Sequence, residues 1–216
     1  MTGADRSSSP HVREVAARYL RDFERLIAAV DVAAVAGVVA RLASARDGGG
    51  TIFVAGNGGS AATASHWAND LGKATKCAGR SAIRVMCLSD NTPWLTALAN
   101  DEGYERVFSG QLENFAAPGD VLTVLSASGS SPNLVQAVAL ASQRGLTTIG
   151  LLGFDGGVLK GLVDEYLWLP TPVGAYGLVE SGHAMLCDIV TTCLMEDREA
   201  PGHATAGATG DTRGPG

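Results

Sequence analysis

Residues 51–73 carry the side chains of this chain that are best suited to chemistry. The first five, 51–55, are apolar or β-branched, residues 56–59 contain three glycines, and the residues from Ser60 onward favour a helix. This order predicts a strand, a glycine-rich turn and a helix. Backbone N–H groups in such a turn and at the start of the helix bind anions, so the expected ligand is a phosphate.

His66 and Asp70 lie one turn apart on the predicted helix. Residues four positions apart face the same side of a helix, so the imidazole and the carboxylate can share a metal ion or a proton. A phosphate site and a polar pair on one helix indicate chemistry on a phosphorylated small molecule. The simpler alternative is a helix-face histidine that bonds only a backbone carbonyl.

A second hydroxyl-rich loop follows a later predicted strand, at residues 126–131, and a helix is predicted to begin near Pro132. Serine hydroxyls and backbone N–H groups beside a helix start can bind the same phosphoryl group. Taken alone, the loop fits a serine-rich capping turn equally well. No nearby lysine takes the place it has in a Walker loop, which argues against nucleotide triphosphate hydrolysis. The hydroxyls belong to Ser126, Ser128, Ser130 and Ser131.

The elements that position these loops alternate between strands and helices. The expected strands are residues 51–55, 83–88, 121–125, 147–152 and 166–169. Such alternation predicts an α/β fold, a three-layer sandwich of flavodoxin-like type with a five-stranded parallel sheet covered on both faces. Ligands then bind beyond the carboxyl ends of the strands. The loops at those ends are residues 56–60, 89–91, 126–131 and 153–157.

A dinucleotide site is a weaker interpretation of the same residues. Gly56, Gly58 and Ala61 fit the loose G-x-G-x-x-G/A pattern, and Asp90 follows a later strand as a ribose-binding acid does. However, Asp90 lies 34 residues after Gly56, whereas about 20 are expected. The serine-rich loop would also have no role in a dinucleotide site.

The two ends of the chain differ from this core. Apolar residues recur every three or four positions from Pro10 to Arg46, which predicts an N-terminal helical arm. We expect this arm to pack against a partner subunit, although it could also cover its own sheet. Residues 1–9 and 198–216 are predicted to be disordered and flexible because they have little to bury. Residues 10–197 remain as one domain.

Composition excludes several classes of protein. The net charge of −6 argues against nucleic acid as the main partner. The four cysteines form no CxxC motif, and two lie in apolar runs, so free thiols in a reducing cytoplasm are expected. No stretch approaches the roughly 20 apolar residues of a membrane span, and the N-terminus lacks a signal-peptide core. We therefore expect a cytoplasmic protein with no membrane partner.

Five segments together resemble the sugar isomerase (SIS) domain proteins, and among them the phosphoheptose isomerases. They are GNGGSAATASHWANDL, SASGSSPN, ALANDEGYERVF, LLGFDGG and VESGH. The resemblance implies the SIS fold, a homotetramer with sites made by neighbouring chains, and a role in heptose biosynthesis. The implied reaction converts sedoheptulose 7-phosphate to D-glycero-D-manno-heptose 7-phosphate. The same family includes non-catalytic members, so a phosphosugar-binding regulator or assembly factor is the alternative.

The resemblance also implies which residues bind the substrate. The serines of the two loops hold the phosphate, Asn57 touches the sugar or its phosphate, and two further loops lie near the sugar chain. The implied set is Asn57, Gly58, Gly59, Ser60, Asp90, Asn100, Asp101, Ser126, Ser128, Ser131 and Glu180.

A divalent metal, zinc in many relatives, is implied at four positions of two helices. Relatives use a histidine and a glutamate on the first helix, and a glutamine and a histidine on the late helix. The corresponding residues are His66, Asp70, Glu180 and Asp188. Three differ from the usual type, and three carboxylates beside one histidine favour harder cations such as Mn²⁺ or Mg²⁺ alongside Zn²⁺.

Aldose–ketose conversion moves a proton between C1 and C2 through an enediol, so it needs an acid–base group and stabilisation of the oxyanion. Asp70, together with either Asp188 or His183, is the predicted proton shuttle, and the metal would polarise the oxygens. His183 lies one turn after Glu180 and is an alternative to Asp188. A purely structural role for His183 is equally consistent with the sequence.

Overall fold

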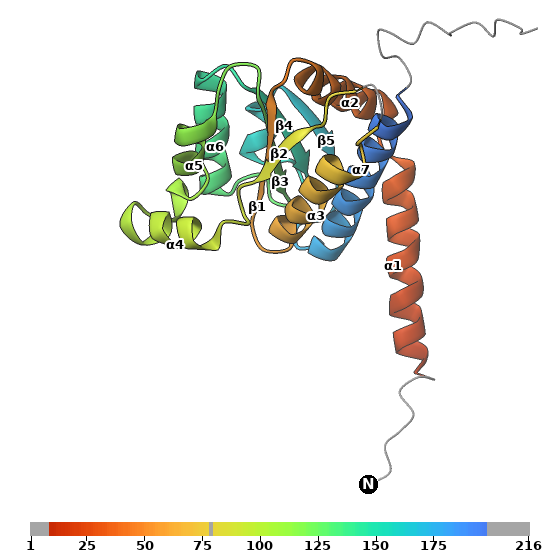
Figure 1. Ribbon diagram of the computed structural model, residues 1–216. Coiled ribbons are helices and arrows are strands. Elements are labelled where there is room, and N and C mark those ends of the chain that lie inside the picture. The colour runs from red at the N-terminus through yellow and green to blue at the C-terminus, as the bar shows by residue number, and fades with distance from the viewer. Residues whose placement is uncertain (1–8, 78–79, 198–216) are drawn as a thin grey trace, which may run out of the picture.

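The computed structural model describes residues 9–77 and 80–197, which form a parallel sheet with helices on both faces (Figure 1). The predictions made for residues 1–8 and 198–216 lie outside the described residues. The strands are β1 (Thr51–Gly56), β2 (Arg84–Cys87), β3 (Val121–Ser126), β4 (Thr147–Leu152) and β5 (Glu165–Trp168). Their order is β2-β1-β3-β4-β5, and every neighbouring pair is parallel. The predicted five-stranded parallel sheet is confirmed.

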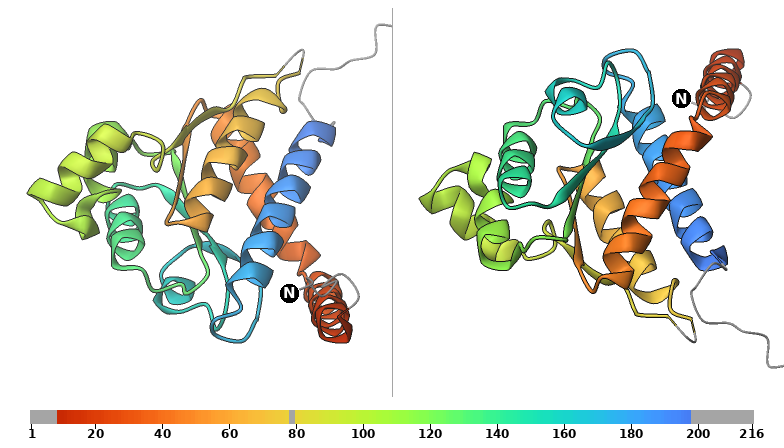
Figure 2. Two further views of the ribbon diagram at one scale, coloured as in Figure 1. Left: turned by 90° about the horizontal axis from the view of Figure 1, so that it is seen from below. Right: turned by 90° about the horizontal axis from the view of Figure 1, so that it is seen from above.

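Seven α-helices and two short 3₁₀ helices, η2 and η3, surround the sheet within the described residues. The helices are α1 (Pro10–Ala28), α2 (Val32–Asp47), α3 (Gly59–Lys73), α4 (Thr92–Asp101), η2 (Tyr104–Arg106), α5 (Ser109–Phe115), α6 (Pro132–Gln143), η3 (Val158–Gly161) and α7 (Tyr176–Glu196). Helices α2, α3 and α7 cover one face, and α5 and α6 cover the other (Figures 1 and 2). The three-layer arrangement is therefore the one predicted.

Alternation along the strands explains why both faces are buried. Ile52 and Val54 of β1 belong to the core beneath α2, α3 and α7, which contains Trp67 as its largest buried side chain. Phe53 and Ala55 point the opposite way, into the core beneath α5 and α6. Because successive side chains of a strand face opposite sides, an uninterrupted apolar run fills both cores.

The predicted arm, residues 10–46, consists of two helices: α1 projects from one end of the body, whereas α2 packs on the sheet (Figures 1 and 2). Leu26 is the one residue of α1 that the described chain buries. Apolar side chains elsewhere on α1 remain exposed, so its own sheet does not cover this helix. The exposed apolar residues are Val12, Val15, Tyr19, Leu20 and Ile27.

Helix α7 corrects the prediction that no segment is long and apolar enough to cross a membrane. Its 21 residues pass that test by length and composition. In the fold, however, α7 packs against α1, α2 and α3, and it buries Val179, Leu186, Val190 and Leu194. The apolar composition of α7 is therefore explained by its place in a protein core.

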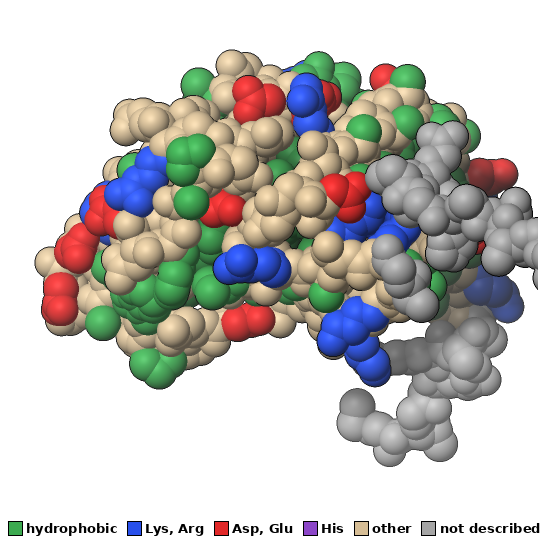
Figure 3. Space-filling view, turned by 45° about the horizontal axis from the view of Figure 1, so that its top comes forward, with side chains coloured by type: hydrophobic (Ala, Val, Ile, Leu, Met, Phe, Trp, Pro, Cys, Tyr) green, Lys and Arg blue, Asp and Glu red, His purple; other side chains and the backbone are tan. Residues whose placement is uncertain are grey.

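The described surface carries charges of both signs, and the cysteines form no disulfide within the described chain. On the face shown in Figure 3, the described acidic and basic side chains are interspersed, without a large basic area. All four cysteines are free thiols, with Cys87 and Cys187 buried and Cys77 and Cys193 exposed. The prediction of free thiols is confirmed.

Candidate active site

The two predicted phosphate-binding loops face one another across a cavity of about 170 Å³ at the carboxyl ends of β1 and β3. The first turn of α7 closes a third side. Six residues predicted from the sequence line this cavity. They are Asn57, Ser60, Ser126, Ser128, Ser131 and Glu180. The structure therefore brings the two loops and the late helix together, and the role of these residues in binding stays a prediction.

The helix starts at this cavity have backbone N–H groups available for a ligand. Within the described part of the chain, no side chain caps α3 at Gly58 or α6 at Ser131. The first turn of α3 carries N–H groups without intrahelical partners, whereas at α6 Pro132 has no N–H and the Leu134 N–H donates to Asn133 Oδ1. Both helix starts carry the positive end of a helix dipole. Gly58 has a φ of 54°, a conformation that favours glycine. An anion between the loops would therefore meet two helix N-termini.

A neighbouring loop supports the serine-rich loop. The Gly129 backbone N–H donates to Ser126 Oγ over 3.0 Å, and Gly129 has a φ of 62°. A Cβ atom at Gly129 would overlap the Gly156 carbonyl, so the loop that follows β4 lies directly against it. The Val158 N–H also donates to Ser130 Oγ over 3.3 Å. The serine-rich loop therefore packs directly against the loop that follows β4.

Glu180 places a carboxylate at the first turn of α3. A Cβ atom at Gly59 would overlap this carboxylate, so a glycine is needed for it to approach. Among the described residues that line the cavity, Glu180 carries the one charged side chain. The cavity therefore has an uncharged, donor-rich side at the serine loop and an acidic side at Glu180.

Asn57 belongs to a hydrogen-bond network that the sequence did not indicate. Asn57 and the buried Asn133 exchange two amide hydrogen bonds of 2.9 Å each. Tyr104 on η2 donates its hydroxyl to Asn57 Oδ1 over 3.0 Å. Asn133 and Tyr104 both lie in segments that resemble the SIS proteins, but their spacing gave no sign of a shared role.

His66 and Asp70 form the predicted pair on one face of α3. His66 Nε2 lies 3.3 Å from Asp70 Oδ2, and the two side chains are 66% and 25% exposed. Asn69 donates to the other oxygen of Asp70 over 3.1 Å. Helical spacing puts His66 and Asp70 on the same face as Gly59. This face borders α7, because Glu180 contacts Gly59 and α3 packs against α7.

The four predicted metal ligands do not form one cluster. Among residues 9–77 and 80–197, no three His, Cys, Asp or Glu side chains lie close enough to hold a metal ion. Glu180 reaches the start of α3, whereas Asp70 lies 11 residues further along the chain, and Asp188 is exposed. The donors of a single chain therefore do not fit a metal site. Metal binding stays a prediction.

His183, the alternative catalytic residue, lies in the core. Its side chain is 1% exposed, and neither ring nitrogen has a hydrogen-bond partner in the described chain. Burial lowers the pKa of His183 to about 4, and the nearby Leu152 carbonyl only partly opposes this shift. The imidazole is therefore neutral at pH 7, and it does not line the cavity.

Five of the predicted substrate residues do not line the cavity of their own chain: Gly58 and Gly59 at the start of α3, and Asp90, Asn100 and Asp101. Asp90, Asn100 and Asp101 are exposed, and Asn100 donates to the Asp101 carboxylate over 2.7 Å. Asn100 and Asp101 are at the end of α4, which projects from the body (Figures 1 and 2). Their role in substrate binding stays a prediction.

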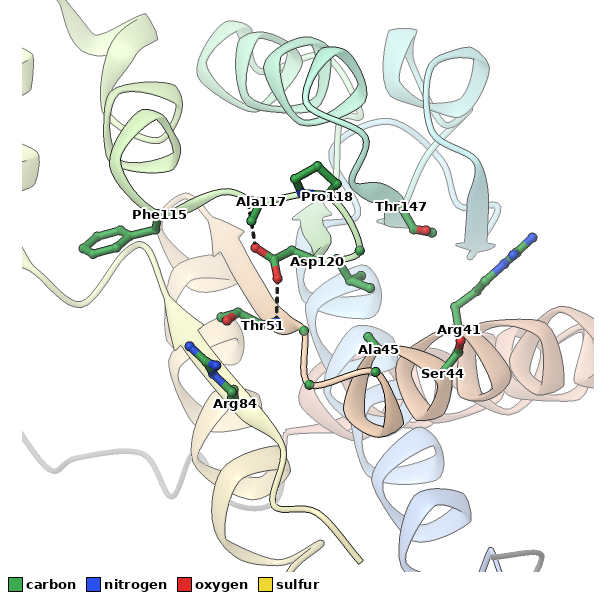
Figure 4. A pocket seen from close by; sticks show the side chains of 15 residues that line it. Arg41, Ser44, Ala45, Thr51, Arg84, Phe115, Ala117, Pro118, Asp120 and Thr147 are labelled. Carbon is green, nitrogen blue, oxygen red and sulfur yellow. Dashed lines mark hydrogen bonds between the residues drawn. The ribbon is translucent and has the colours of Figure 1, made fainter. Parts of the chain in front are cut away.

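A larger cavity of about 520 Å³ lies at the opposite edge of the sheet, where β1, β3 and β4 begin (Figure 4). Its Asp120 carboxylate accepts hydrogen bonds from the backbone N–H groups of Thr51 and Ala117, at 2.7 and 2.9 Å. Arg41 pairs with Glu165 at 3.1 Å. These groups are used to hold strand ends, and ligands of parallel sheets bind at the other edge. The larger cavity is therefore a structural feature.

Comparisons with known proteins agree with the geometry. The sequence model of the SIS domain family matches residues 18–153. A phosphoheptose isomerase from Geobacter metallireducens is 42% identical over 169 residues, which cover 76% of this chain and 86% of the relative. The chain belongs to the phosphoheptose isomerase family of SIS-domain proteins.

Two further members of this family support the assignment. A phosphoheptose isomerase from Paramagnetospirillum magneticum is 44% identical over 147 residues, or 66% of this chain and 74% of the relative. The solved structure of a phosphoheptose isomerase from Neisseria gonorrhoeae has a TM-score of 0.76 at 29% identity. That comparison covers 85% of this chain and 96% of the other.

Proposed function

We propose that this protein interconverts sedoheptulose 7-phosphate and D-glycero-D-manno-heptose 7-phosphate. The observation that carries the proposal is the cavity in which the two serine-bearing loops meet at the starts of α3 and α6. Family membership supports the same reaction, since the relatives compared above are named phosphoheptose isomerases.

The phosphoryl group would lie on the uncharged side of the cavity. Ser128 and Ser131 offer hydroxyls there, Ser60 offers one from the first turn of α3, and the helix starts offer backbone N–H groups. Glu180 would repel a phosphate but accept hydrogen bonds from sugar hydroxyls. These preferences orient the substrate with its phosphate toward the serine loops and its hydroxyl groups toward α7.

The position of the acid–base residues suits a long sugar. His66 and Asp70 follow Ser60 by six and ten residues on α3, which corresponds to about 9 and 15 Å along a helix axis. An extended phosphosugar held at Ser60 would thus run along α3 toward this pair. Binding energy from the remote phosphate would then orient the reacting carbons.

Asp70 is the proposed acid–base residue. Conversion of the ketose removes a proton from C1 and returns a proton to C2 through an enediol. His66, at 3.3 Å, orients the Asp70 carboxylate, and Asp188 on α7 is the second candidate for the proton shuttle.

We also propose that the protein is a soluble, cytoplasmic homotetramer that associates through α1. The apolar face of α1 is exposed: Leu20 is 68% exposed and Tyr19 is 42% exposed. Exposed apolar surface of this kind favours association. Leu20→Glu should convert the tetramer to smaller species in light scattering, whereas Arg21→Glu on the same helix should not. An unchanged mass for Leu20→Glu would contradict association through this face.

Product analysis tests the proposed reaction. Purified protein is incubated with sedoheptulose 7-phosphate, with and without EDTA, and the sugar phosphates are identified by NMR. We expect the aldoheptose 7-phosphate to form. Absence of product from any ketose phosphate, together with a ligand-induced rise in melting temperature, would instead show the non-catalytic phosphosugar-binding protein.

A further inference from the structure

The Asn57 side chain lines the cavity directly after β1, next to the proposed phosphate site. A carboxamide has two N–H donors on nitrogen and two acceptor sites on oxygen. A rotation of the amide by 180° exchanges donors for acceptors. What Asn57 offers to a ligand therefore depends on what holds the amide in one orientation.

A backbone N–H group determines that orientation. The Leu134 N–H donates to Asn133 Oδ1 over 2.9 Å, and a backbone N–H can only donate. The oxygen of Asn133 is thereby fixed on one side, where it also accepts from Asn57 Nδ2. Asn133 Nδ2 must then donate to Asn57 Oδ1. Burial of Asn133 at 2% exposure keeps water from replacing these bonds.

Tyr104 occupies the remaining acceptor site of Asn57. Its hydroxyl donates to Asn57 Oδ1 over 3.0 Å, from η2, which packs against α6. The oxygen of Asn57 then has two donors, and its nitrogen has used one of two N–H groups. One N–H donor of Asn57 is left for the cavity.

We propose that Asn133 and Tyr104 are positioning residues that lock Asn57 as a hydrogen-bond donor to an acceptor oxygen of the bound phosphosugar. This inference rests on the proposed function for the identity of the ligand. Because the remaining group of Asn57 is an N–H donor, it cannot accept a hydrogen bond from a hydroxyl of the ligand. Asn57 therefore prefers an acceptor, a phosphoryl or carbonyl oxygen.

Tyr104→Phe tests the network without endangering the fold, because Tyr104 is 55% exposed. The variant keeps the ring but frees one acceptor site of Asn57, so the amide loses part of its restraint. We expect about a fivefold rise in the Kd of sedoheptulose 7-phosphate, the effect of about one hydrogen bond. Tyr166→Phe is the matched control, a tyrosine 40% exposed on β5 outside the cavity lining. Equal Kd values for the two variants would overturn the proposal.

Asn133→Asp gives a second, larger test. The side chain keeps its size and its acceptor for Leu134, but it replaces the donor to Asn57 with an acceptor. We expect the Kd of sedoheptulose 7-phosphate to be at least about tenfold higher for Asn133→Asp than for Tyr166→Phe. The melting temperature of Asn133→Asp shows whether the variant is folded. Wild-type affinity in a folded variant would contradict the positioning role.

Calorimetric Kd values keep this inference separate from the reaction. If the wild-type protein binds sedoheptulose 7-phosphate but forms no aldose product, the proposed reaction is wrong. The Kd values of the variants still decide whether Asn133 and Tyr104 position Asn57.

Discussion

The cavity and the α3–α7 seam are built in different ways. The cavity consists of loops at the ends of buried strands, and its serines are held by backbone contacts such as that between Gly129 and Gly156. The seam consists of side chains on two packed helices. There His66 and Asp188 are exposed, and of the four predicted metal ligands His66 and Asp70 form the pair in contact within the described chain.

The cavity is the proposed binding region, and the α3–α7 seam is the proposed region of proton transfer. One chain completes the proposed phosphate site because strand ends and helix starts are placed by the sheet itself. The proposed acid–base residues lie along α3 and α7 without forming a cluster of three in the described chain. Substrate, a cation or a neighbouring chain would have to complete that part, so mutations in the two regions should have different effects.

Asp70→Asn should have the largest effect. The amide cannot take up the proton, so we expect kcat to fall at least about 100-fold, the usual scale of general base catalysis. The Kd of sedoheptulose 7-phosphate should change by less than about threefold, because Asp70 lies outside the cavity lining. Steady-state kinetics and calorimetry give the two values.

The control for Asp70→Asn is Glu196→Gln, which removes an exposed carboxylate at the end of α7. It should leave kcat unchanged. Wild-type turnover by Asp70→Asn would contradict a catalytic role for Asp70. A loss of substrate affinity as large as the loss of kcat would show that Asp70 also belongs to the binding site.

Gly59→Ala should have the next largest effect. A Cβ atom at Gly59 would overlap the Glu180 carboxylate, so that side chain must move. We expect about a tenfold loss of kcat/KM with little loss of melting temperature, since the end of a glutamate can shift at low cost. Gly161→Ala is the control, because nothing lies within 4 Å of its Cβ position. Identical kcat/KM values for the two variants would show that activity does not depend on the position of the Glu180 carboxylate beside Gly59.

Ser128→Ala should weaken binding more modestly. It removes one hydroxyl from the cavity, so KM should rise about fivefold with kcat nearly unchanged, as expected for one hydrogen bond. Ser130→Ala in the same loop is the control, because Ser130 bonds Val158 and does not line the cavity. A larger effect at Ser130 than at Ser128 would contradict the assignment of the cavity.

His183→Gln should have the smallest effect on activity. Its main effect should be on the pH dependence of stability. Burial lowers the folded-state pKa from 6.5 to about 4, so the unfolded chain binds a proton first as the pH falls. Stability should therefore decrease from about pH 6.5 to pH 4, by about 3 kcal/mol at most. The variant should flatten the dependence of melting temperature on pH in this range.

His11→Gln provides the comparison for His183→Gln, because His11 is an exposed histidine of α1. It should keep the parent's pH dependence. A parental pH profile in His183→Gln would show that the buried imidazole is not the source of acid sensitivity.

Local patterns predicted the sheet and the positions of the two serine-bearing loops well. Apolar runs such as residues 147–152 became strands with those bounds, and the glycine and serine motifs fell at the expected strand ends. These features depend on short-range sequence. The predicted phosphate loops met because parallel strands end at the same edge.

Contacts between distant segments could not be predicted in the same way. The bond between Asn57 and Asn133 joins residues 76 positions apart, and no residue pattern encodes it. The approach of Glu180 to Gly59 and the burial of His183 depend on how α7 is rotated against the sheet. The apolar composition of α7 also concealed which of its polar residues face the cavity.

A crystal structure of the protein with sedoheptulose 7-phosphate tests the central claim most directly. We expect the phosphoryl oxygens within hydrogen-bond distance of Ser60 and Ser128, with the sugar extending along α3 toward Asp70. A phosphoryl group bound elsewhere, for example beside Arg84 in the larger cavity, would contradict the account.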